Sequence, residues 1–200
     1  MSHYFQDDPE LAHDYRTYSF TLFGEEITLQ SDAGVFSKDG LDDGSKLLLE
    51  TIGKADLGGS ILDLGCGIGP IGLSLAVLDP HRHVVLSDIN PRALACCRAN
   101  AERLGLEKRV DVVESDVYDA FHNQLFTAVV TNPPIRAGKA VTYAIYAGAV
   151  SHLHQGGSLI LVIRKQQGAD SCFRYLQTIF SDVEILASKK GYKIIKALKA

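Results

Sequence analysis

The segment from Ile61 to Pro70 limits the folds open to this chain more than any other. Its sequence is Ile-Leu-Asp-Leu-Gly-Cys-Gly-Ile-Gly-Pro, so a short apolar strand with an acid near its end runs into a glycine-rich turn. Apolar residues then continue in the manner of a helix. Glycine permits a turn that brings the backbone close to a ligand, and in an open parallel sheet ligands bind at the carboxyl edge. The segment therefore predicts an α/β fold with a small cofactor beside this turn.

Strand and helix patterns alternate from residue 60 onward. Helices are predicted between strands at 60–64, 83–88, 109–114, 126–131 and 157–163. Several of these strands are almost continuously apolar, as expected for parallel strands that are buried on both faces. The alternation predicts a doubly wound α/β sheet.

The C-terminal end of the chain follows a different pattern. Residues 182–188 and 191–198 are two predicted strands with only about two residues between them. Because this is too short for a crossover helix, the two strands should pair antiparallel. We therefore expect a mostly parallel, seven-stranded sheet that ends in an antiparallel hairpin.

The N-terminal part is predicted to add a β-hairpin extension. Residues 17–23 and 26–30 have β-rich composition around a glycine, and a glycine-containing loop and a helix capped by Ser45 follow. The whole chain of 200 residues is expected to be a single domain. Its hairpin, loop and helix occupy residues 1–58, and its cofactor-binding and catalytic core occupies residues 59–200.

The net charge of −4 is unevenly distributed along the chain. Residues 1–63 carry −9, residues 64–136 carry −1, and residues 137–200 carry +6. A chain polarised in this way can present a basic face to a polyanion while it stays acidic overall. The alternative is that the C-terminal lysines are solvated residues of an edge strand.

Composition and cysteine spacing exclude several classes of protein. No apolar run approaches the roughly 20 residues that cross a bilayer, so we expect no membrane contact. The N-terminus lacks the basic and apolar regions of a signal peptide, and a cytoplasmic location is therefore expected. Four cysteines without zinc-ligand spacing are interpreted as free thiols, and no metal is expected: Cys66, Cys96, Cys97 and Cys172.

The glycine turn also matches, letter by letter, a dinucleotide-binding fingerprint at Gly67, Gly69 and Gly72. In the register that the strand end sets, however, Pro70 stands where the third glycine is required. Asp63 gives a second argument, because its carboxylate would repel a pyrophosphate and attract a cationic cofactor. A nicotinamide-dependent oxidoreductase is therefore the least favoured interpretation.

A second motif, Asn132-Pro133-Pro134-Ile135, directly follows another apolar strand. The prolines fix the backbone, and the first lacks an N–H while its carbonyl stays available as an acceptor. The asparagine oxygen and that carbonyl can take the two hydrogens of an exocyclic amine. Because such a nitrogen is a poor nucleophile, orientation and electrostatics must supply much of the rate. The alternative is an ordinary Pro-Pro loop.

The two motifs together resemble those of class I S-adenosylmethionine-dependent methyltransferases that act on amino groups. The runs 34–42 (Gly-Val-Phe-Ser-Lys-Asp-Gly-Leu-Asp), 131–139 and 190–192 are similar to the "methyltransferase small" family, which includes bacterial ribosomal RNA guanine-N2 methyltransferases. The resemblance begins at about residue 15 and covers the rest of the chain. It implies a Rossmann-like methyltransferase fold, S-adenosylmethionine as cofactor, and transfer to an exocyclic amine of guanine in ribosomal RNA.

The resemblance also assigns roles to individual residues. Asp88 would accept hydrogen bonds from the ribose hydroxyls, and Asp116 would contact the adenine amine with Val117 against the ring. The full set for the cofactor is Asp63, Gly65, Gly67, Gly69, Asp88, Ile89, Asp116, Val117 and Asn132. The catalytic set is Asn132, Pro133, Pro134 and Ile135.

The chain departs from the family pattern at two points. Ile135 stands where most members have an aromatic residue that stacks on the substrate, so Phe36 and Tyr192 are the candidates for stacking. The ribosomal members carry a second domain that helps to bind RNA, for which 200 residues leave no room. Binding of ribosomal RNA or a ribosomal subunit would then fall to a second subunit of a homodimer or to basic residues, namely Arg136, Lys139, Arg164, Lys165 and the C-terminal lysines.

Two other functions stay open because of these departures. A protein glutamine-amide methyltransferase uses the same amine-holding motif. A cofactor-binding scaffold without activity belongs to another class, and the intact Asn-Pro-Pro sequence argues against it.

Overall fold

Seven strands form the central sheet in the order β5-β4-β3-β6-β7-β9-β8. The structure is a computed structural model that describes residues 11–36 and 38–200. The strands of the sheet are β3 (Ser60–Leu64), β4 (His83–Asp88), β5 (Val110–Glu114), β6 (Phe126–Thr131), β7 (Leu153–Arg164), β8 (Asp182–Lys189) and β9 (Tyr192–Leu198). The α-helices are α1 (Asp43–Ile52), α2 (Pro70–Leu78), α3 (Pro91–Arg103), α4 (Lys139–His152) and α5 (Ala169–Ile179).

Strand β9 runs against the other six strands. Strands β5, β4, β3, β6 and β7 pair parallel, whereas β9 pairs antiparallel with both β7 and β8. Lys190 and Gly191 form the turn between β8 and β9, and both have positive φ, as a tight hairpin turn requires. The mostly parallel sheet with a terminal antiparallel hairpin is therefore confirmed.

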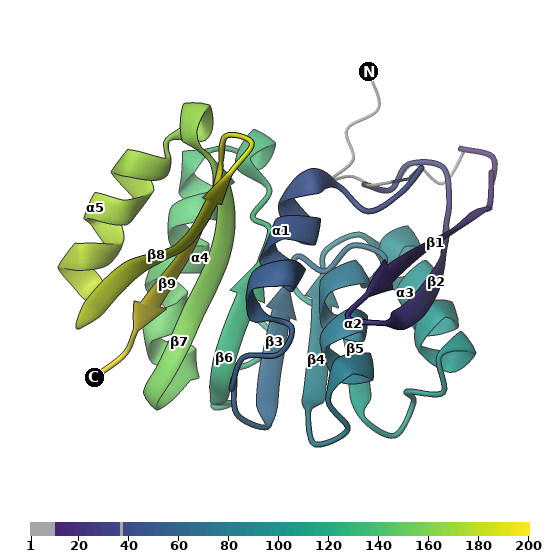
Figure 1. The fold of residues 1–200 in the computed structure, drawn as a ribbon, viewed down its shortest axis with the longest axis horizontal. Coiled ribbons are helices and arrows are strands. Elements are labelled where there is room, and N and C mark those ends of the chain that lie inside the picture. Colours follow the sequence, from purple (N-terminus) through teal and green to yellow (C-terminus); the bar gives the residue numbers. More distant parts are fainter. Residues whose placement is uncertain (1–10, 37) are drawn as a thin grey trace.

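The helices cover both faces of the sheet (Figure 1). One hydrophobic cluster joins α1, α2 and α3 to one face, and a second cluster joins α4 and α5 to the other. Chain order reverses at β3, since β4 lies on one side of it and β6 on the other. In open α/β sheets the crevice at such a reversal is where ligands bind. The carboxyl ends of β3 and β6 are therefore the place to look for the site.

A two-stranded hairpin of β1 (Arg16–Leu22) and β2 (Glu25–Ser31) lies beside α2 and α3 (Figure 1). The side chain of Asn100 in α3 is fully buried and attaches the hairpin to the core. Its amide exchanges hydrogen bonds of 2.7 and 2.9 Å with the backbone of Gln30 and also donates to the carbonyl of Ile68 at 3.1 Å. The extension thus supports the glycine-rich turn after β3 from behind.

The structure differs from the sequence prediction at several element ends. Helix α1 is capped by Asp42, whose Oδ1 accepts from the N–H groups of Gly44 and Ser45, and not by Ser45. The turn of the N-terminal hairpin is Phe23-Gly24, one residue earlier than predicted. Strand β7 begins four residues before the predicted position. Within the described ranges no helix is long and apolar enough to span a bilayer.

Candidate active site

The turn after β3 is fixed to the neighbouring strand. The N–H groups of Gly65 and Cys66 both donate to the carbonyl of Ser87, at 2.8 and 2.9 Å. Gly65 and Gly67 have positive φ, at 74° and 56°, and a Cβ on either would meet no protein atom within 4 Å. Such a side chain would project into open space above the turn. The backbone there is accessible to a ligand only because both residues are glycines.

Asp63 lies beneath this turn. The side chain is 0% exposed, and its Oδ2 accepts from the N–H of Gly72 in the first turn of α2 at 2.7 Å. No described group donates a hydrogen bond to its Oδ1. Burial raises the pKa of Asp63 to about 7, although the Gly72 bond acts in the opposite direction. The carboxyl group therefore supports the turn from below, whereas the sequence placed it as a contact of the cofactor.

Asp88 ends β4 beside the turn and is only partly exposed. Its Oδ2 accepts from Gly67 N–H at 2.8 Å and its Oδ1 from Asn90 N–H at 2.9 Å. Burial raises the pKa of Asp88, and these backbone bonds oppose the shift. Each oxygen keeps further acceptor capacity. Ile89, the next residue, is 47% exposed, so a carboxylate and an apolar surface stand together at this strand end.

Val117 has a strained backbone at the end of the third strand of the site. Its φ is +50°, which is rare for a β-branched residue and is found where surrounding structure enforces it. Ser115 Oγ donates to the carbonyl of Val117 at 3.0 Å and accepts from the N–H of Ala120. The adjacent Asp116 is exposed. The turn thus presents a carboxylate and a half-buried apolar side chain next to β4.

These features fit the adenosine and methionine parts of S-adenosylmethionine. An open glycine cradle, a carboxylate with acceptor capacity, and apolar side chains at positions 89 and 117 line the carboxyl ends of β3, β4 and β5. The residues that would hold the cofactor are Gly65, Gly67, Asp88, Ile89, Asp116 and Val117.

Gly69, by contrast, has a role in packing. It has φ of 93° and precedes α2, and a Cβ added to it would lie 2.7 Å from the Leu73 side chain. No group of three metal-ligating side chains occurs in the part of the chain that the structure describes.

Asn132 follows β6 and lies next to the glycine turn. Thr131 Oγ1 donates to the carbonyl of Leu64 at 2.7 Å and so joins the ends of β6 and β3. Asn132 Nδ2 donates to Oδ1 of Asp42 at 3.3 Å and to Oγ of Ser45 at 3.1 Å. The predicted catalytic residue is therefore anchored to the start of α1, which the sequence did not indicate.

The two prolines shape the loop after Asn132. Pro134, with φ of −74° and ψ of 76°, is the centre of an inverse γ-turn in which Ile135 N–H donates to the carbonyl of Pro133 at 2.8 Å. The Pro133 carbonyl is thus already an acceptor, which corrects the expectation that it is free, although a carbonyl has a second lone pair. Ile135 is half-buried against the cluster on the α4 face.

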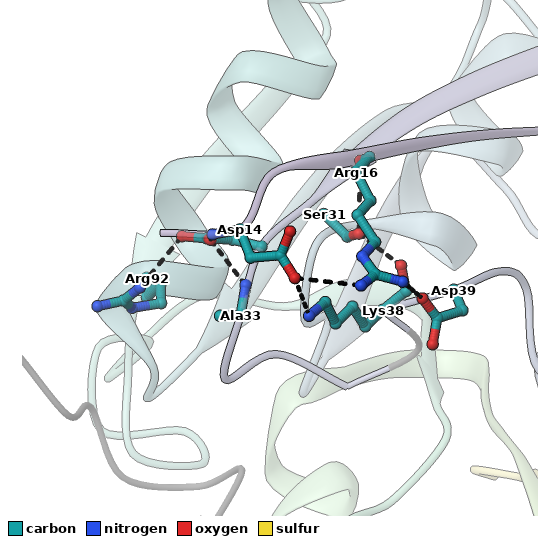
Figure 2. A network of polar contacts seen from close by, with 8 residues as sticks. Asp14, Arg16, Ser31, Ala33, Lys38, Asp39 and Arg92 are labelled. Atoms are coloured by element: carbon teal, nitrogen blue, oxygen red, sulfur yellow. Dashed lines mark hydrogen bonds and ion pairs between the residues drawn. The ribbon is translucent and has the colours of Figure 1, made fainter. Parts of the chain in front are cut away.

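Ion pairs hold the loop between β2 and α1. Figure 2 shows Asp14 between Arg16 and Lys38, with Arg16 also bound to Asp39. Buried Asp32 accepts from the N–H groups of Asp14 and Ala33 and pairs with Arg92 of α3 at 3.2 Å. Burial alone would raise the pKa of Asp32, but hydrogen bonds, first that of His13, lower it overall.

The candidate substrate contacts lie at or near the carboxyl edge of the sheet but differ in accessibility. Phe36 is 56% exposed in the loop before α1. Tyr192 is half-buried, with the Arg164 guanidinium 4.7 Å from its ring centre and Gly44 packed against it. Arg136, Lys139 and Lys165 are exposed. Among the C-terminal lysines, Lys193, Lys196 and Lys199 contact Asp170, Glu184 and the Leu153 carbonyl.

Residues 26–196 match the family model described as the methyltransferase small domain. The chain belongs to this family. Membership confirms the class of enzyme predicted above, a methyltransferase that uses S-adenosylmethionine.

Relatives of this methyltransferase small domain include proteins of known and unknown activity. An uncharacterized protein, YbxB of Bacillus subtilis, is 42% identical over 198 residues, which are 98% of each chain. The ribosomal RNA small subunit methyltransferase C of Erwinia tasmaniensis is 35% identical over 88% of this chain and 50% of its own length. The ribosomal RNA large subunit methyltransferase G of Klebsiella pneumoniae is 32% identical over 96% of this chain and 51% of its own length. The chain therefore spans about half the length of these two enzymes.

A solved structure supports the same assignment. The 16S rRNA N2 methyltransferase RsmC of T. thermophilus, in complex with AdoMet and guanosine, superposes with a TM-score of 0.84 at 28% identity. The match covers 98% of this chain and 53% of the RsmC chain. The predicted class I methyltransferase fold is confirmed.

Proposed function

We propose that this protein transfers a methyl group from S-adenosylmethionine to the exocyclic N2 amine of a guanine in ribosomal RNA. The observation that carries the proposal is the orientation of Asn132. Its amide nitrogen faces Asp42 and Ser45, which leaves its carbonyl oxygen as an acceptor, and the preceding Thr131 joins this strand end to Leu64 at the start of the glycine turn. An acceptor at that place suits a substrate that offers amine hydrogens.

The chemistry needs little from the protein beyond orientation. S-adenosylmethionine, when bound, supplies an electrophilic methyl group. Asn132 Oδ1 and the second lone pair of the Pro133 carbonyl can accept the two amine hydrogens, which aims the nitrogen lone pair. The proton that the nitrogen loses after alkylation is acidic enough for water to accept, so no preformed base is required.

Phe36 is the better of the two candidates for stacking on the base. Its ring is largely exposed, whereas one face of Tyr192 is covered by Arg164 and its edge packs on Gly44. Ile135, which is half-buried beside the Asn-Pro-Pro sequence, would add an apolar contact. A planar base held by one aromatic ring and one aliphatic side chain is consistent with the missing aromatic residue at position 135.

Basic residues near the carboxyl edge would bind the RNA backbone. We assign this role to Arg136, Lys139, Arg164 and Lys165, which lie at or after the carboxyl ends of β6 and β7, the edge where Asn132 lies. The later lysines of β9 lead away from this edge, because β9 runs antiparallel to β7 and Lys196 pairs with Ile160 in mid-strand. The ribosomal RNA activities of the relatives support a polyanionic substrate.

Transfer of labelled methyl from S-adenosylmethionine tests the proposal. The parallel substrates are deproteinised ribosomal RNA, intact ribosomal subunits and total protein, all from cells that lack this enzyme. Label in RNA or subunits, recovered as N2-methylguanosine after nucleoside digestion, is the expected result. Label in protein alone would replace the proposal with glutamine-amide methylation, and cofactor binding without any label would favour a scaffold.

Asn132→Ala separates catalysis from cofactor binding. We expect methyl transfer to be lost because the amine acceptor is gone, while the affinity for S-adenosylhomocysteine, measured by calorimetry, stays nearly unchanged. The matched control is Asn123→Ala, which removes an exposed amide and should preserve both. Collapse of cofactor affinity in Asn132→Ala would contradict this division of roles.

A further inference from the structure

Asp42 and Ser45 belong to a segment far from the Asn-Pro-Pro motif in sequence. Asp42 is the N-cap of α1, and its Oδ1 accepts from the N–H groups of Gly44 and Ser45 at 3.0 and 3.1 Å. Ser45 is buried, at 2% exposure. The same Asp42 oxygen and the Ser45 hydroxyl are the two acceptors of Asn132 Nδ2. One helix start thus holds one end of the Asn132 amide.

This contact determines which way the amide points. A carboxylate can only accept hydrogen bonds, so the nitrogen end of Asn132 must face Asp42. A flipped amide would place two oxygen atoms against each other and leave the carboxylate without this donor. The carbonyl oxygen is therefore held on the side away from Asp42 and Ser45, and within the described part of the chain it accepts no hydrogen bond.

The charge of Asp42 adds an electrostatic effect. A helix N-terminus favours a carboxylate, and a carboxylate that accepts from an amide N–H polarises the amide toward its oxygen. The oxygen then becomes a stronger acceptor for amine hydrogens. Since a nitrogen that gives up its lone pair to a methyl group gains positive charge, this polarisation favours the transition state more than the ground state.

We propose that Asp42 and Ser45 are positioning residues for methyl transfer, which fix the orientation of the Asn132 amide and strengthen its oxygen as an acceptor. The inference rests on the proposed function, in which that oxygen receives the amine hydrogens. Neither residue needs to touch the substrate, because both act through Asn132.

Asp42→Asn and Ser45→Ala test the proposal. Asparagine is as good an N-cap as aspartate, so Asp42→Asn keeps the cap of α1 and removes only the charge. Ser45→Ala removes one acceptor of Asn132. The matched control is Asp43→Asn, which removes the exposed neighbouring charge of the same helix turn, whose carboxylate pairs with Lys190 at 3.5 Å.

The first measurement is the side-chain NH₂ resonance of Asn132 in asparagine-labelled protein, identified by its loss in Asn132→Ala. We expect slow hydrogen exchange in the wild type and a shifted, faster-exchanging pair in Asp42→Asn and Ser45→Ala, with no change in Asp43→Asn. An Asn132 pair that exchanges freely in the wild type, or that neither variant alters, would overturn the positioning role.

The second measurement is the rate of methyl transfer with saturating cofactor. We expect kcat to fall about tenfold in Asp42→Asn, the scale of one weakened charge-assisted hydrogen bond, with unchanged KM for S-adenosylmethionine and unchanged Tm. An unchanged kcat would overturn the electrostatic effect. A wild-type protein that methylates no ribosomal RNA would refute the proposed function instead, and the amide resonance would then decide the positioning role by itself.

Discussion

Two aspartates near the ends of adjacent strands have the same chemistry and different surroundings. Asp63 is enclosed below the glycine turn, with one oxygen bonded to Gly72 and the other without a described partner. Asp88 stands beside the turn with both oxygens bonded to backbone N–H groups and one edge open. The first is a structural carboxyl group with a raised pKa, and the second is a candidate ligand of the cofactor.

The pKa of Asp63 predicts a pH dependence of stability in the cofactor-free protein. Burial raises this pKa from 3.8 to about 7, so between these values the unfolded chain loses a proton that the folded chain keeps. The free energy of unfolding therefore falls as pH rises through this range, by up to about 4 kcal/mol if the whole shift in pKa is expressed. Asp63→Asn keeps an acceptor for Gly72 without the ionisation.

We expect the free energy of unfolding of the wild type to fall between pH 5 and pH 8 relative to that of Asp63→Asn. Urea titration at several pH values measures both free energies. The control is Asp116→Asn, an exposed carboxylate at the same edge of the sheet, which should follow the wild type. Parallel pH profiles for the wild type and Asp63→Asn would contradict the raised pKa.

Asp88→Ala should weaken binding of S-adenosylhomocysteine about tenfold or more, because charge-assisted hydrogen bonds to the ribose and the anchor of Gly67 are removed together. Calorimetry measures the affinity. Asp111→Ala on the neighbouring strand removes an exposed carboxylate, at 63% side-chain exposure, and serves as the control. Equal affinities of the wild type and Asp88→Ala would exclude the ribose role.

At the scale of elements, helix α4 approaches the turn after β5 closely. The ring of Tyr118 lies on Gly148, stacks on His152 with ring centres 4.4 Å apart, and donates its hydroxyl to the carbonyl of Ile145 at 2.9 Å. A Cβ on Gly148 would lie 2.5 Å from the Tyr118 ring. The helix that follows the Asn-Pro-Pro loop is thereby fixed to the turn that carries Val117.

Gly148→Ala sets two effects against each other. Alanine favours a helix over glycine by about 1 kcal/mol, whereas overpacking typically costs about 1–3 kcal/mol. Because the clash is with a buried ring, we expect net destabilisation, measured as a lower Tm. In a Tyr118→Ala background the clash is absent, and the same substitution should raise Tm. Destabilisation of equal size in both backgrounds would show that the ring is not the cause.

Helices and strands could be predicted from the sequence because their signals are local. The contacts between them could not be predicted in this way. In α3 the local signals in the sequence are Asn90 before Pro91 and an apolar stripe, and in the structure Asn90 is the N-cap while Leu94, Cys97 and Ala101 are buried. In α4, Val141, Ala144, Ile145 and Gly148 have the spacing of one helix face. Only Ile145 of these is among the buried residues of the helix, which are Thr142, Ile145, Tyr146 and Ala149. Packing between two layers decides that offset, and no periodicity in one helix contains it.

The site shows the same division between local and distant information. The glycine turn, Asp88 and Asn132 are predictable because each follows a strand in a recognisable local pattern. Asp42 and Ser45 are 90 and 87 residues from their partner Asn132, so nothing near the Asn-Pro-Pro motif points to them. The one local signal is the aspartate before α1, and the sequence pattern offers Ser45 as a competing cap of the same helix.

At the scale of the whole molecule, basic residues lie both near the carboxyl edge of the sheet and away from it. Four basic residues lie near the carboxyl edge, namely Arg136, Lys139, Arg164 and Lys165. Lys196 of β9 lies away from this edge and forms an ion pair with Glu184 at 3.5 Å. Overall the protein is acidic, with a net charge of −4. The RNA binding that we propose would therefore depend on where the positive charge lies more than on the net charge.

Salt dependence tests this arrangement. We expect the double variant Arg136→Gln/Lys139→Gln to weaken RNA binding and to lower the slope of log affinity against log salt by roughly 1 for each phosphate that the protein no longer neutralises. The matched control, Lys108→Gln/Lys196→Gln, removes the same charge away from the carboxyl edge and should keep the slope. Equal decreases in the two double variants would mean that binding follows net charge alone.

The left-handed backbone of Val117 has a consequence for how this protein tolerates sequence change. A β-branched residue at φ of +50° carries strain that glycine or asparagine would relieve. Selection for folding alone would therefore accept those residues at position 117, whereas the contact with the cofactor that we propose for Val117 would favour an apolar side chain there. In an evolving population, substitutions at this position that improve thermal tolerance would therefore be ones that reduce activity.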